Sequence, residues 1–558
     1  MDTDVIVVGS GPTGLLLACE LALAGVRTLV VERRTEPQQD SRALTLHPRS
    51  LELMDLRGLA PRFLGLGRTL PGWHFAALET PLDFAALDSR LAHTLFLAQA
   101  RTEELLAQRA QELGVEIRRG HTLTGLRQGE DGVEAEVRGP QDGPGGGARA
   151  ARGGPSPRPP PPRGARARGR GVADGGGAPA GGGGGRPGHG PAGTPRTLRA
   201  AYLVGCDGGR STVREAAGID FPGTDETLTG VLGDFATVTA GPEALAAARG
   251  AGVLAVPLEG GLTRFVYIDP ERMRTPAQVP VTLEEFRSAL VRLCGSDFGV
   301  DRPSWLSRFG NATRLAAAYR SGRVLLAGDA AHIHFPAAGQ GLNTGLQDAM
   351  NLGWKLAAEV RGWAPPGLLD TYHAERHPVG RAVTDNTEVQ TLLAELPLVD
   401  RYRRPAAALR GLFEELLRMP EVNRRFAEQV SALGTAYPAT APGADPLVGR
   451  RMPDIALSAA GSDATRVYEL LHRGGFVLLR LAGARDPNPE PYEAPARHPH
   501  ISAVTARAYE EHPELDGVRE VLVRPDGHIA WATRSADAGL RRTGRDAALT
   551  AWAVRSPA

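Results

Sequence analysis

A glycine-rich turn near the N-terminus constrains the fold more than any other feature of the sequence. The stretch Asp4–Val8 is continuously apolar, as in a buried strand, and it runs directly into Gly9-Ser10-Gly11-Pro12-Thr13-Gly14. A helical pattern follows over 15–24, and a second strand over 27–31 leads to Glu32. Strand, glycine turn, helix, strand and acid in this order predict a dinucleotide-binding βαβ unit.

Each position of this motif has a physical reason. Gly9 permits a tight turn, Gly11 lets backbone amides approach a diphosphate, and Gly14 lets helix and strand pack closely. The helix N-terminus adds a partial positive charge, and Glu32 can accept hydrogen bonds from a ribose. The alternative is a glycine-rich turn without a ligand. The motif by itself does not separate FAD from NAD.

A second candidate segment begins with the apolar strand Arg323–Ala327 and continues into Gly328-Asp329. Asp329, at the carboxyl end of the strand, is placed to accept a hydrogen bond from a ribityl or ribose hydroxyl. The following stretch, Pro336–Gly341, lacks bulky side chains, so a flat ring could lie against its backbone. A helix starting at Gly341–Asn343 would direct its amides at that ring and favour negative charge there. The alternative is an ordinary strand–turn–helix crossover.

Between these segments lies a third, in which the strand-like Tyr202–Gly205 ends in Cys206-Asp207-Gly208. Ser211 is a candidate cap for a short helix. Cys206 is better explained as a packed apolar thiol than as a redox centre.

With these three segments in this order, the sequence resembles the FAD-dependent aromatic hydroxylases, the para-hydroxybenzoate hydroxylase-like flavoprotein monooxygenases. Within that group it is most similar to aromatic polyketide hydroxylases and rifampicin monooxygenase. The stretches that carry this likeness are VGCDGGRSTVR, WLSRFGNATR, LLAGDAAHIH, LQDAMNLGWKLA and LLDTYHAERHPV.

The resemblance implies a bound FAD and a set of residues around it. This set comprises Gly9, Gly11, Thr13, Gly14, Glu32, Arg33, Arg42, Gln99, Leu123, Asp207, Asp329, Pro336, Gly341, Leu342 and Asn343. Arg42 and Pro336 are expected near the flavin ring, but no side chain is assigned as a catalytic acid or base. One departure from the family is Ala338, where glycine is more usual, and this departure could narrow the space at the flavin edge.

The activity that the resemblance implies is hydroxylation of an aromatic polyketide- or rifamycin-type molecule by a flavin C4a-hydroperoxide, with NAD(P)H and O2 as co-substrates. A second GxGxxG is absent, so NAD(P)H is expected to bind transiently. Three alternatives remain: Baeyer–Villiger oxygenation, a flavin oxidase or dehydrogenase without oxygen insertion, and a flavoprotein that binds an aromatic ligand without turnover.

The candidate lining of the substrate pocket is aromatic, although each of its members taken singly is better explained as ordinary core. These candidates are Trp73, Phe75, Phe235 and Phe265. The stretch Pro336–Gly341, against which the flavin ring could lie, is called the flavin loop below. Two histidines near it, His332 and His334, are interpreted as structural, against a role in tuning the flavin.

The predicted class is α/β, with a Rossmann-type FAD-binding domain, an interleaved β-sheet substrate domain and a C-terminal thioredoxin-like domain. The FAD-binding parts are 1–138, 197–218 and 321–390, the substrate domain is mainly 219–320, a helical connection covers 391–446, and 447–558 forms the last domain. No cysteine follows Cys294, which excludes thiol–disulfide chemistry in that last domain. Asp526-Gly527 predicts a hairpin turn between two of its strands.

Residues 139–196 are almost entirely Gly, Pro, Arg and Ala. They cannot bury enough apolar surface to offset the entropy of ordering, about 1–2 kcal/mol per residue. This composition predicts a disordered insert in place of a short turn between two strand-like segments, 132–138 and 198–204. A genuine linker and an out-of-frame stretch of GC-rich coding DNA both explain it.

Composition narrows the remaining possibilities. The formal net charge of +1 does not favour nucleic acid or an anionic membrane as a partner. The three widely spaced cysteines predict neither a disulfide framework nor a metal site, and the acidic N-terminus does not look like a signal peptide. We therefore expect a cytoplasmic enzyme, monomeric or homodimeric.

Overall fold

The computed structural model describes residues 1–140, 195–439, 442–459, 462–482 and 498–554, and structural statements below refer to these residues. The predicted insert, 139–196, lies almost wholly outside them.

A six-stranded sheet organises the first half of the fold, in the order β19-β20-β12-β1-β2-β8. Its strands are β1 (Val5–Val8), β2 (Thr28–Glu32), β8 (Glu116–Arg119), β12 (Tyr202–Gly205), β19 (Arg320–Ser321) and β20 (Val324–Leu326). Strand β1 pairs in parallel with β2 and β12, and β12 pairs in parallel with β20. Because β1, β12 and β20 are parallel neighbours, their carboxyl ends share one edge of the sheet. The three predicted motifs therefore meet there.

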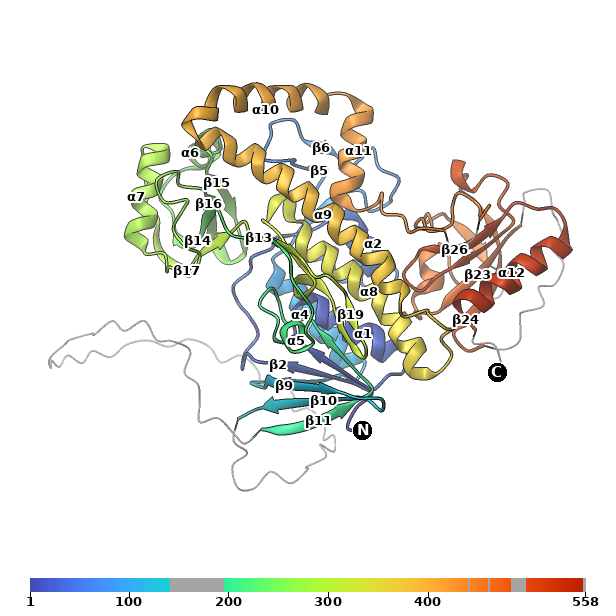
Figure 1. The fold of residues 1–558 in the computed structure, drawn as a ribbon. Coiled ribbons are helices and arrows are strands. Elements are labelled where there is room, and N and C mark those ends of the chain that lie inside the picture. Colours follow the sequence, from blue (N-terminus) through green and yellow to red (C-terminus); the bar gives the residue numbers. More distant parts are fainter. Residues whose placement is uncertain (141–194, 440–441, 460–461, 483–497, 555–558) are drawn as a thin grey trace, which may run out of the picture.

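Two helices against this sheet approach each other closely. Helix α1 (Pro12–Leu23) follows the glycine turn, and α8 (Gln340–Arg361) is the long helix predicted after the flavin loop. Glycines on α8 make the close approach possible: a Cβ on Gly345 would lie 2.4 Å from Oγ1 of Thr13, and one on Gly353 would lie 2.5 Å from Cβ of Glu20. Figure 1 shows α9 (Thr371–Glu395) running alongside α8.

Shorter elements complete this part of the chain. They are β3 (Thr45–Leu46), α2 (Pro48–Asp55), α3 (Ala60–Leu64), β4 (Arg68–Leu70), β5 (Gly72–Trp73), β6 (Leu82–Asp83), β7 (Thr94–Phe96), α4 (Gln99–Glu112) and α5 (Thr212–Ala216).

The strands on either side of the predicted insert pair with each other. Strand β10 (Val133–Arg138) lies antiparallel to β11 (Arg196–Ala200) and to β9 (Thr122–Gln128). This pairing confirms the hairpin-like arrangement expected there. The expectation of one strand over 198–204 is wrong: the chain leaves this sheet after Ala200 and enters the parallel sheet as β12 at Tyr202.

A second, antiparallel sheet forms the unit predicted to contact substrate. Its order is β15-β16-β14-β17, with bounds β14 (Thr229–Thr237), β15 (Leu254–Pro257), β16 (Thr263–Tyr267) and β17 (Asp301–Gly310). Helices α6 (Pro242–Ala247) and α7 (Leu283–Cys294) belong to the same unit. A small sheet of β13 (Gly223–Thr224), β18 (Thr313–Leu315) and β21 (His332–Ile333) connects it to the flavin loop.

The chain then forms a helical segment and a compact C-terminal unit. The helices α10 (Arg403–Leu417) and α11 (Pro420–Ser431) lie over β5 and β6 (Figure 1). The C-terminal unit has a five-stranded sheet, β22-β24-β23-β25-β26. Its elements are β22 (Leu457–Ala459), β23 (Phe476–Ala482), β24 (Ile501–Ala508), β25 (Glu520–Val523), β26 (Ile529–Thr533) and α12 (Ala538–Trp552). The predicted hairpin is confirmed, since β25 and β26 are antiparallel and Gly527 has a φ of 79°.

Buried charges fasten this C-terminal unit to the rest of the chain. Glu375 on α9 accepts hydrogen bonds from Lys355 on α8, the only lysine in the sequence, and from Arg524 beyond β25, both at 2.6 Å. Arg524 also pairs with Asp526. Burial alone would raise the pKa of Glu375, but Arg524 and Lys355 hold it at about 2. The carboxylate is therefore the shared counter-charge of two buried cations.

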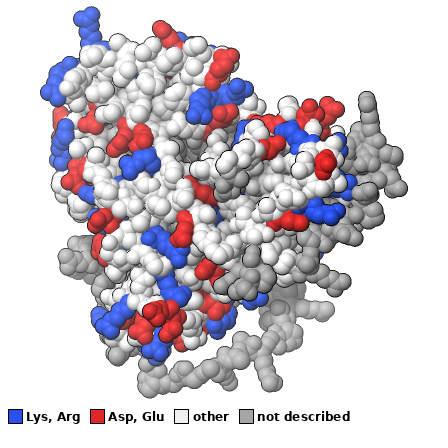
Figure 2. Space-filling model, turned by 45° about the vertical axis from the view of Figure 1, so that its right-hand side comes forward, with Lys and Arg blue, Asp and Glu red and all other residues white. Residues whose placement is uncertain are grey.

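No helix in the described part of the chain is long and apolar enough to span a membrane. On the face drawn in Figure 2, basic and acidic side chains alternate without a large area of either sign.

We expect Glu375→Gln to lower the free energy of unfolding by about 3–5 kcal/mol, because Lys355 would remain buried without its counter-charge and Arg524 would keep only Asp526. Urea denaturation followed by circular dichroism measures this change. Asp385→Asn, at an exposed position on the same helix, is the matched control and should shift stability by no more than about 0.5 kcal/mol. A Glu375→Gln variant as stable as the control would contradict the proposed bridging role.

Candidate functional site

The glycine turn after β1 is tightly packed at two positions and open at a third. A Cβ on Gly9 would lie 2.3 Å from the carbonyl oxygen of Cys206, and one on Gly14 would lie 2.1 Å from the carbonyl oxygen of Gly9. A Cβ on Gly11 would meet nothing within 4 Å. Gly11 also caps α1 without any side-chain hydrogen bond. An open approach beside uncapped helix amides fits a diphosphate.

Glu32 supports this turn from the end of β2. Its carboxylate accepts hydrogen bonds from the backbone and hydroxyl of Ser10, at 2.8 and 3.0 Å, and from the amide of Arg34 at 2.9 Å. Burial by itself raises the pKa of Glu32, but these hydrogen bonds together hold it below its ordinary value. The group is therefore an ionised acceptor, as a ribose contact requires. Arg33 beside it is exposed.

Asp329 is exposed in the turn that follows β20. It follows Gly328, whose φ is 63°, in a short 3₁₀ turn at the end of β20. The side chain is solvent-exposed, yet desolvation by the surrounding protein raises the pKa of its carboxyl, an effect that His332 and Arg42 partly offset.

A buried carboxylate on α8 holds this turn in place. Asp348 accepts hydrogen bonds from the amide of Gly328 at 3.1 Å, from Nε2 of His332 at 2.8 Å and from Nε of Arg376 at 2.7 Å. Burial would raise the pKa of Asp348, but Arg376 and His332 keep it lowered. His332 is thus hydrogen-bonded within the network that holds the Gly328 turn.

The loop before α8 has a left-handed backbone and is tied to the strand β3. Ala338 has a φ of 51° and Gly339 a φ of 69°. Nε2 of His47 donates to the carbonyl oxygen of Ala338 at 2.7 Å. A left-handed alanine is strained by roughly 1–2 kcal/mol, so the departure from glycine at this position has a conformational cost as well as a steric one.

Asn343 completes this attachment with its side chain. Its Oδ1 accepts from the amide of His47 at 2.8 Å, and its Nδ2 donates to the carbonyl oxygens of Thr45 and Gly339, at 3.2 and 2.8 Å. The side chain is therefore occupied within the protein. Any contact of Asn343 with a flavin would come from its backbone. Gly341 and Leu342, beside it, are partly exposed, and Pro336 is exposed.

The other residues expected around FAD occupy three kinds of position. Arg42 is exposed where the FAD-binding part meets the substrate sheet, and its carbonyl oxygen accepts from Arg264 at 3.3 Å. Gln99, at the start of α4, accepts from the amide of Ala43 at 3.4 Å. Leu123 is buried in the main core.

Asp207 and Thr13 both have structural contacts. Asp207 accepts from the amide of Val213 at 3.1 Å and from the hydroxyl of Ser211, and burial raises the pKa of its carboxyl. The Thr13 side chain lies against Gly328 and Gly345, where α1 meets α8.

The four aromatic residues predicted to line the substrate pocket lie in separate places. Phe235 and Phe265 are fully buried in the core of the substrate unit, with ring centroids 6.0 Å apart. Phe75 is buried in another cluster, which also contains Ala338 of the flavin loop. Only Trp73 retains appreciable exposure, and its indole nitrogen is buried without a hydrogen-bond partner in the described structure.

Several residues of this site were not anticipated from the sequence. His47, Asp348 and Arg376 hold the flavin loop and the Gly328 turn, and Asp234 pairs with Arg264 at 2.7 Å beside Arg42. Single histidines, aspartates and arginines carry no distinctive spacing. Two signals were available, LQDAMNLGWKLA, which contains Asp348, and LLDTYHAERHPV, which contains Arg376.

Three histidines around the loop are neutral. Burial is the main cause that lowers the pKa values of His47, His74 and His334 to about 4. In His334, Nδ1 lies 2.7 Å from the carbonyl oxygen of Phe335, so Nδ1 carries the hydrogen and Nε2 is an acceptor. That Nε2 has no partner among the described residues.

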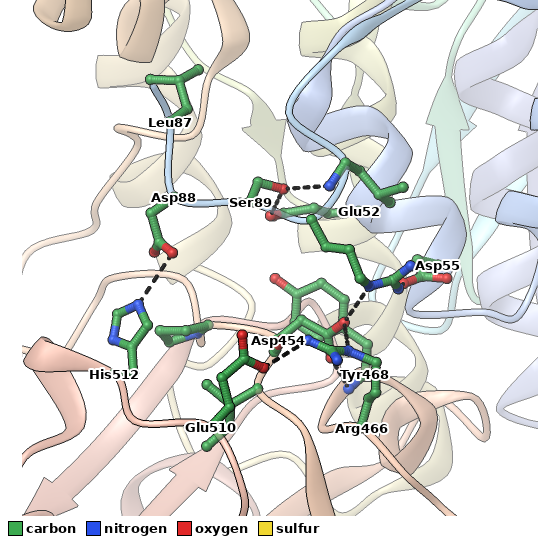
Figure 3. A pocket seen from close by; sticks show the side chains of 14 residues that line it. Glu52, Asp55, Leu87, Asp88, Ser89, Asp454, Arg466, Tyr468, Glu510 and His512 are labelled. Atoms are coloured by element: carbon green, nitrogen blue, oxygen red, sulfur yellow. Dashed lines mark hydrogen bonds and ion pairs between the residues drawn. The ribbon is translucent and has the colours of Figure 1, made fainter. Parts of the chain in front are cut away.

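A cavity of about 380 Å³ lies elsewhere, between α2 and the C-terminal unit (Figure 3). Its lining charges are paired with one another: Arg90 with Asp55 and Asp454, Arg466 with Asp454 and Glu510. We interpret this cavity as a polar gap between the FAD-binding part and the C-terminal unit, and not as the pocket for an aromatic substrate.

Comparison with known proteins agrees with this architecture. Residues 2–150 and 188–387 match the family model described as FAD binding domain, and residues 445–555 match the model described as aromatic-ring hydroxylase, C-terminal. The chain therefore belongs to the FAD-dependent aromatic-ring hydroxylase family, a family of flavoprotein monooxygenases.

Individual relatives cover nearly the whole chain. Rifampicin monooxygenase from Streptomyces venezuelae is 43% identical over 95% of each chain. The anhydrotetracycline hydroxylase OxyS from Streptomyces rimosus has a solved structure that superposes with a TM-score of 0.78, at 40% identity over 99% of each chain. Dialkyldecalin synthase from Streptomyces rugosporus is 36% identical over 99% of each chain.

We expect Gly11→Ala to fold normally and to bind FAD at least about tenfold more weakly, a loss of about 1.4 kcal/mol. The added methyl group has room in the protein but would occupy the approach to the diphosphate. Titration of the apoprotein with FAD, followed by flavin fluorescence, measures the change. Gly129→Ala, where a Cβ also meets nothing within 4 Å, is the control and should bind FAD normally.

Gly14→Ala should instead fail to fold, because its Cβ would overlap the carbonyl oxygen of Gly9. A folded Gly11→Ala variant with wild-type FAD affinity would refute the assignment of the diphosphate position.

Proposed function

We propose that this protein hydroxylates an aromatic polyketide- or rifamycin-type molecule, using NAD(P)H and O2. The observation that carries the proposal is the meeting of three motif turns at one sheet edge, with Gly11 open and Asp329 exposed beside it. Relatives named rifampicin monooxygenase and anhydrotetracycline hydroxylase support this substrate class.

The residues at this edge fit FAD in their donor and acceptor types. The amides at the start of α1 would hold the diphosphate, Glu32 a ribose and Asp329 a ribityl hydroxyl. The amides at the start of α8 would face the ring edge. When bound, FAD would accept a hydride from NAD(P)H and activate O2 in the way the family resemblance implies. Arg42, at the boundary with the substrate sheet, is our candidate for contact with both cofactor and substrate.

The chain contributes position and water exclusion and does not need to supply an acid or base. The cluster behind the flavin loop contains Ala338, Phe75 and Phe84, all buried, with Trp73 packed against it. A dry apolar wall there would protect a reactive oxygen species from water. The neutral His47, His74 and His334 leave this region without added positive charge, which suits an uncharged aromatic ring.

A second function deserves a direct test, because one relative of the whole chain is named as a synthase and not as an oxygenase. In a synthase of this kind, the scaffold would bind a ligand and promote ring formation without oxygen transfer. Baeyer–Villiger oxygenation and peroxide-producing oxidase activity are further outcomes on the same scaffold.

We expect the FAD-loaded protein to insert one atom of labelled oxygen into at least one member of a panel of polyketide quinones, polyketide phenols and rifamycins. Mass spectrometry of products formed with NADH or NADPH and ¹⁸O₂ decides the point. A hydroxylated ring supports hydroxylation, and a ring-expanded lactone supports Baeyer–Villiger chemistry. Label-free products, or peroxide equal to the NAD(P)H consumed, would refute the oxygenase proposal.

We expect Trp73→Phe to weaken binding of an accepted aromatic substrate by about two- to tenfold, the usual value of one hydrogen bond. The unpartnered indole N–H is the group that this substitution removes. Perturbation of the flavin spectrum by substrate gives the affinity. Trp363→Phe is the control, because the Trp363 ring stacks on His500 of the C-terminal unit, with ring centroids 4.0 Å apart. Equal affinity in both variants would remove Trp73 from the substrate wall.

A further inference from the structure

The loop between β5 and β6, residues 74–81, is placed to form one wall of the substrate site. The Trp73 ring at its start lies 6.0 Å from the His47 ring, which is bonded to Ala338 of the flavin loop. Burial is the main cause that lowers the pKa of His74, and the charge of Arg249, in the substrate unit, adds to it. This loop therefore lies between the flavin loop and the substrate unit.

The loop has an unfavourable backbone conformation. Ala76 has a φ of 50° and Ala77 a φ of 53°, so two successive residues with side chains are left-handed. The Cβ of a residue in this conformation crowds its own backbone, which is why residues with side chains rarely adopt it. Such a conformation persists only when other parts of the protein hold it.

Glu414 on α10 provides one such restraint. Its two carboxylate oxygens accept from the amide of Glu79 at 2.6 Å and from the amide of Thr80 at 2.9 Å. Burial acts to raise the pKa of Glu414, but these hydrogen bonds hold it below its usual value. Two consecutive amides of the loop are thus bound by one ionised side chain.

Arg410, one helical turn earlier, holds the strained alanines. It donates to the carbonyl oxygens of Ala76 at 3.4 Å and Ala77 at 3.3 Å, and to that of Leu393 at 2.9 Å. Gln390 on α9 accepts from the amide of Ala76 at 3.0 Å. The left-handed pair is therefore bonded through both its amide and its carbonyl groups.

Asn423 on α11 restrains the far end of the loop. It accepts from the amide of Asp83 at 2.8 Å and donates to the carbonyl oxygen of Pro81 at 2.9 Å. All three helices α9, α10 and α11 therefore bind this one loop by its backbone, so the attachment depends on the loop's conformation more than on its side chains.

We propose that α10 and α11 act as a clamp that sets the position of the Trp73 wall, with Glu414 and Arg410 as positioning residues for substrate selection. The inference rests on the proposed function, because it takes the wall to contact an aromatic substrate. It assigns a role to the helical segment between the FAD-binding part and the C-terminal unit. A clamped wall presents one fixed surface to the substrate, whereas a released loop would relax toward ordinary backbone conformations.

The test compares Glu414→Gln with Glu415→Gln, an exposed neighbour on the same helix that undergoes the same change of charge. We expect amide exchange in residues 74–80 to become at least about tenfold faster in Glu414→Gln only. For an accepted substrate, KM should rise about fivefold or more, while kcat and FAD affinity stay within twofold. Arg410→Met and its exposed control Arg404→Met repeat the comparison independently.

Unaltered exchange in both Glu414→Gln and Arg410→Met would overturn the clamp. Faster exchange with unchanged KM would overturn its role in substrate selection. A fall in FAD affinity equal to the change in KM would reduce both residues to general structural roles. Amide exchange is measured without substrate, so it tests the clamp even if the protein turns over no aromatic compound. Absence of turnover would instead contradict the proposed function.

Discussion

The close contact between α1 and α8 is the constraint on which the site depends. These helices come from opposite ends of the FAD-binding part, yet in the proposed function each begins at a turn that faces the same ligand. Gly345 and Gly353 bring α8 to α1, and Thr13 fills the space beside Gly328. A larger side chain at either glycine would separate the diphosphate turn from the flavin loop. The spacing of the two halves of the site is therefore set by the packing of α1 against α8.

Sequence reasoning succeeded where function and local backbone geometry coincide. The turn at Gly9–Gly14 and the strand before Asp329 have a fixed order and spacing, so the βαβ unit and the second strand with its long helix were predicted correctly. Sequence reasoning was less informative about side chains that act through tertiary contacts. Asn343 was expected at the flavin, but its side chain is bonded to His47 and to the loop backbone. Phe235 and Phe265 are aromatic, as residues of a substrate pocket often are, but they are fully buried in the core. Residue type alone does not distinguish these two positions.

The C-terminal unit shows the same limit of local patterns. Its strands and hairpin follow from turn chemistry, whereas its attachment follows from isolated charges far apart in the chain. Glu375, Lys355 and Arg524 satisfy one another only after α8, α9 and β25 have assembled. A buried group of this kind is weak as a source of net stability, but it strongly disfavours any arrangement that leaves one member unpaired. It therefore fixes how the unit docks.

The proposed clamp offers one physical way in which relatives with such different names can share a scaffold. The FAD-binding edge is built from backbone amides, glycines and a few carboxylates, which leave little room for variation without loss of the cofactor. The loop at Ala76–Ala77 is different, because helices outside the cofactor site hold its strained backbone from behind. Changes in α10 or α11 could move Trp73 without touching a residue of the FAD edge. The reaction outcome would then be decided by the shape of the wall, while the chemistry of the cofactor stays the same.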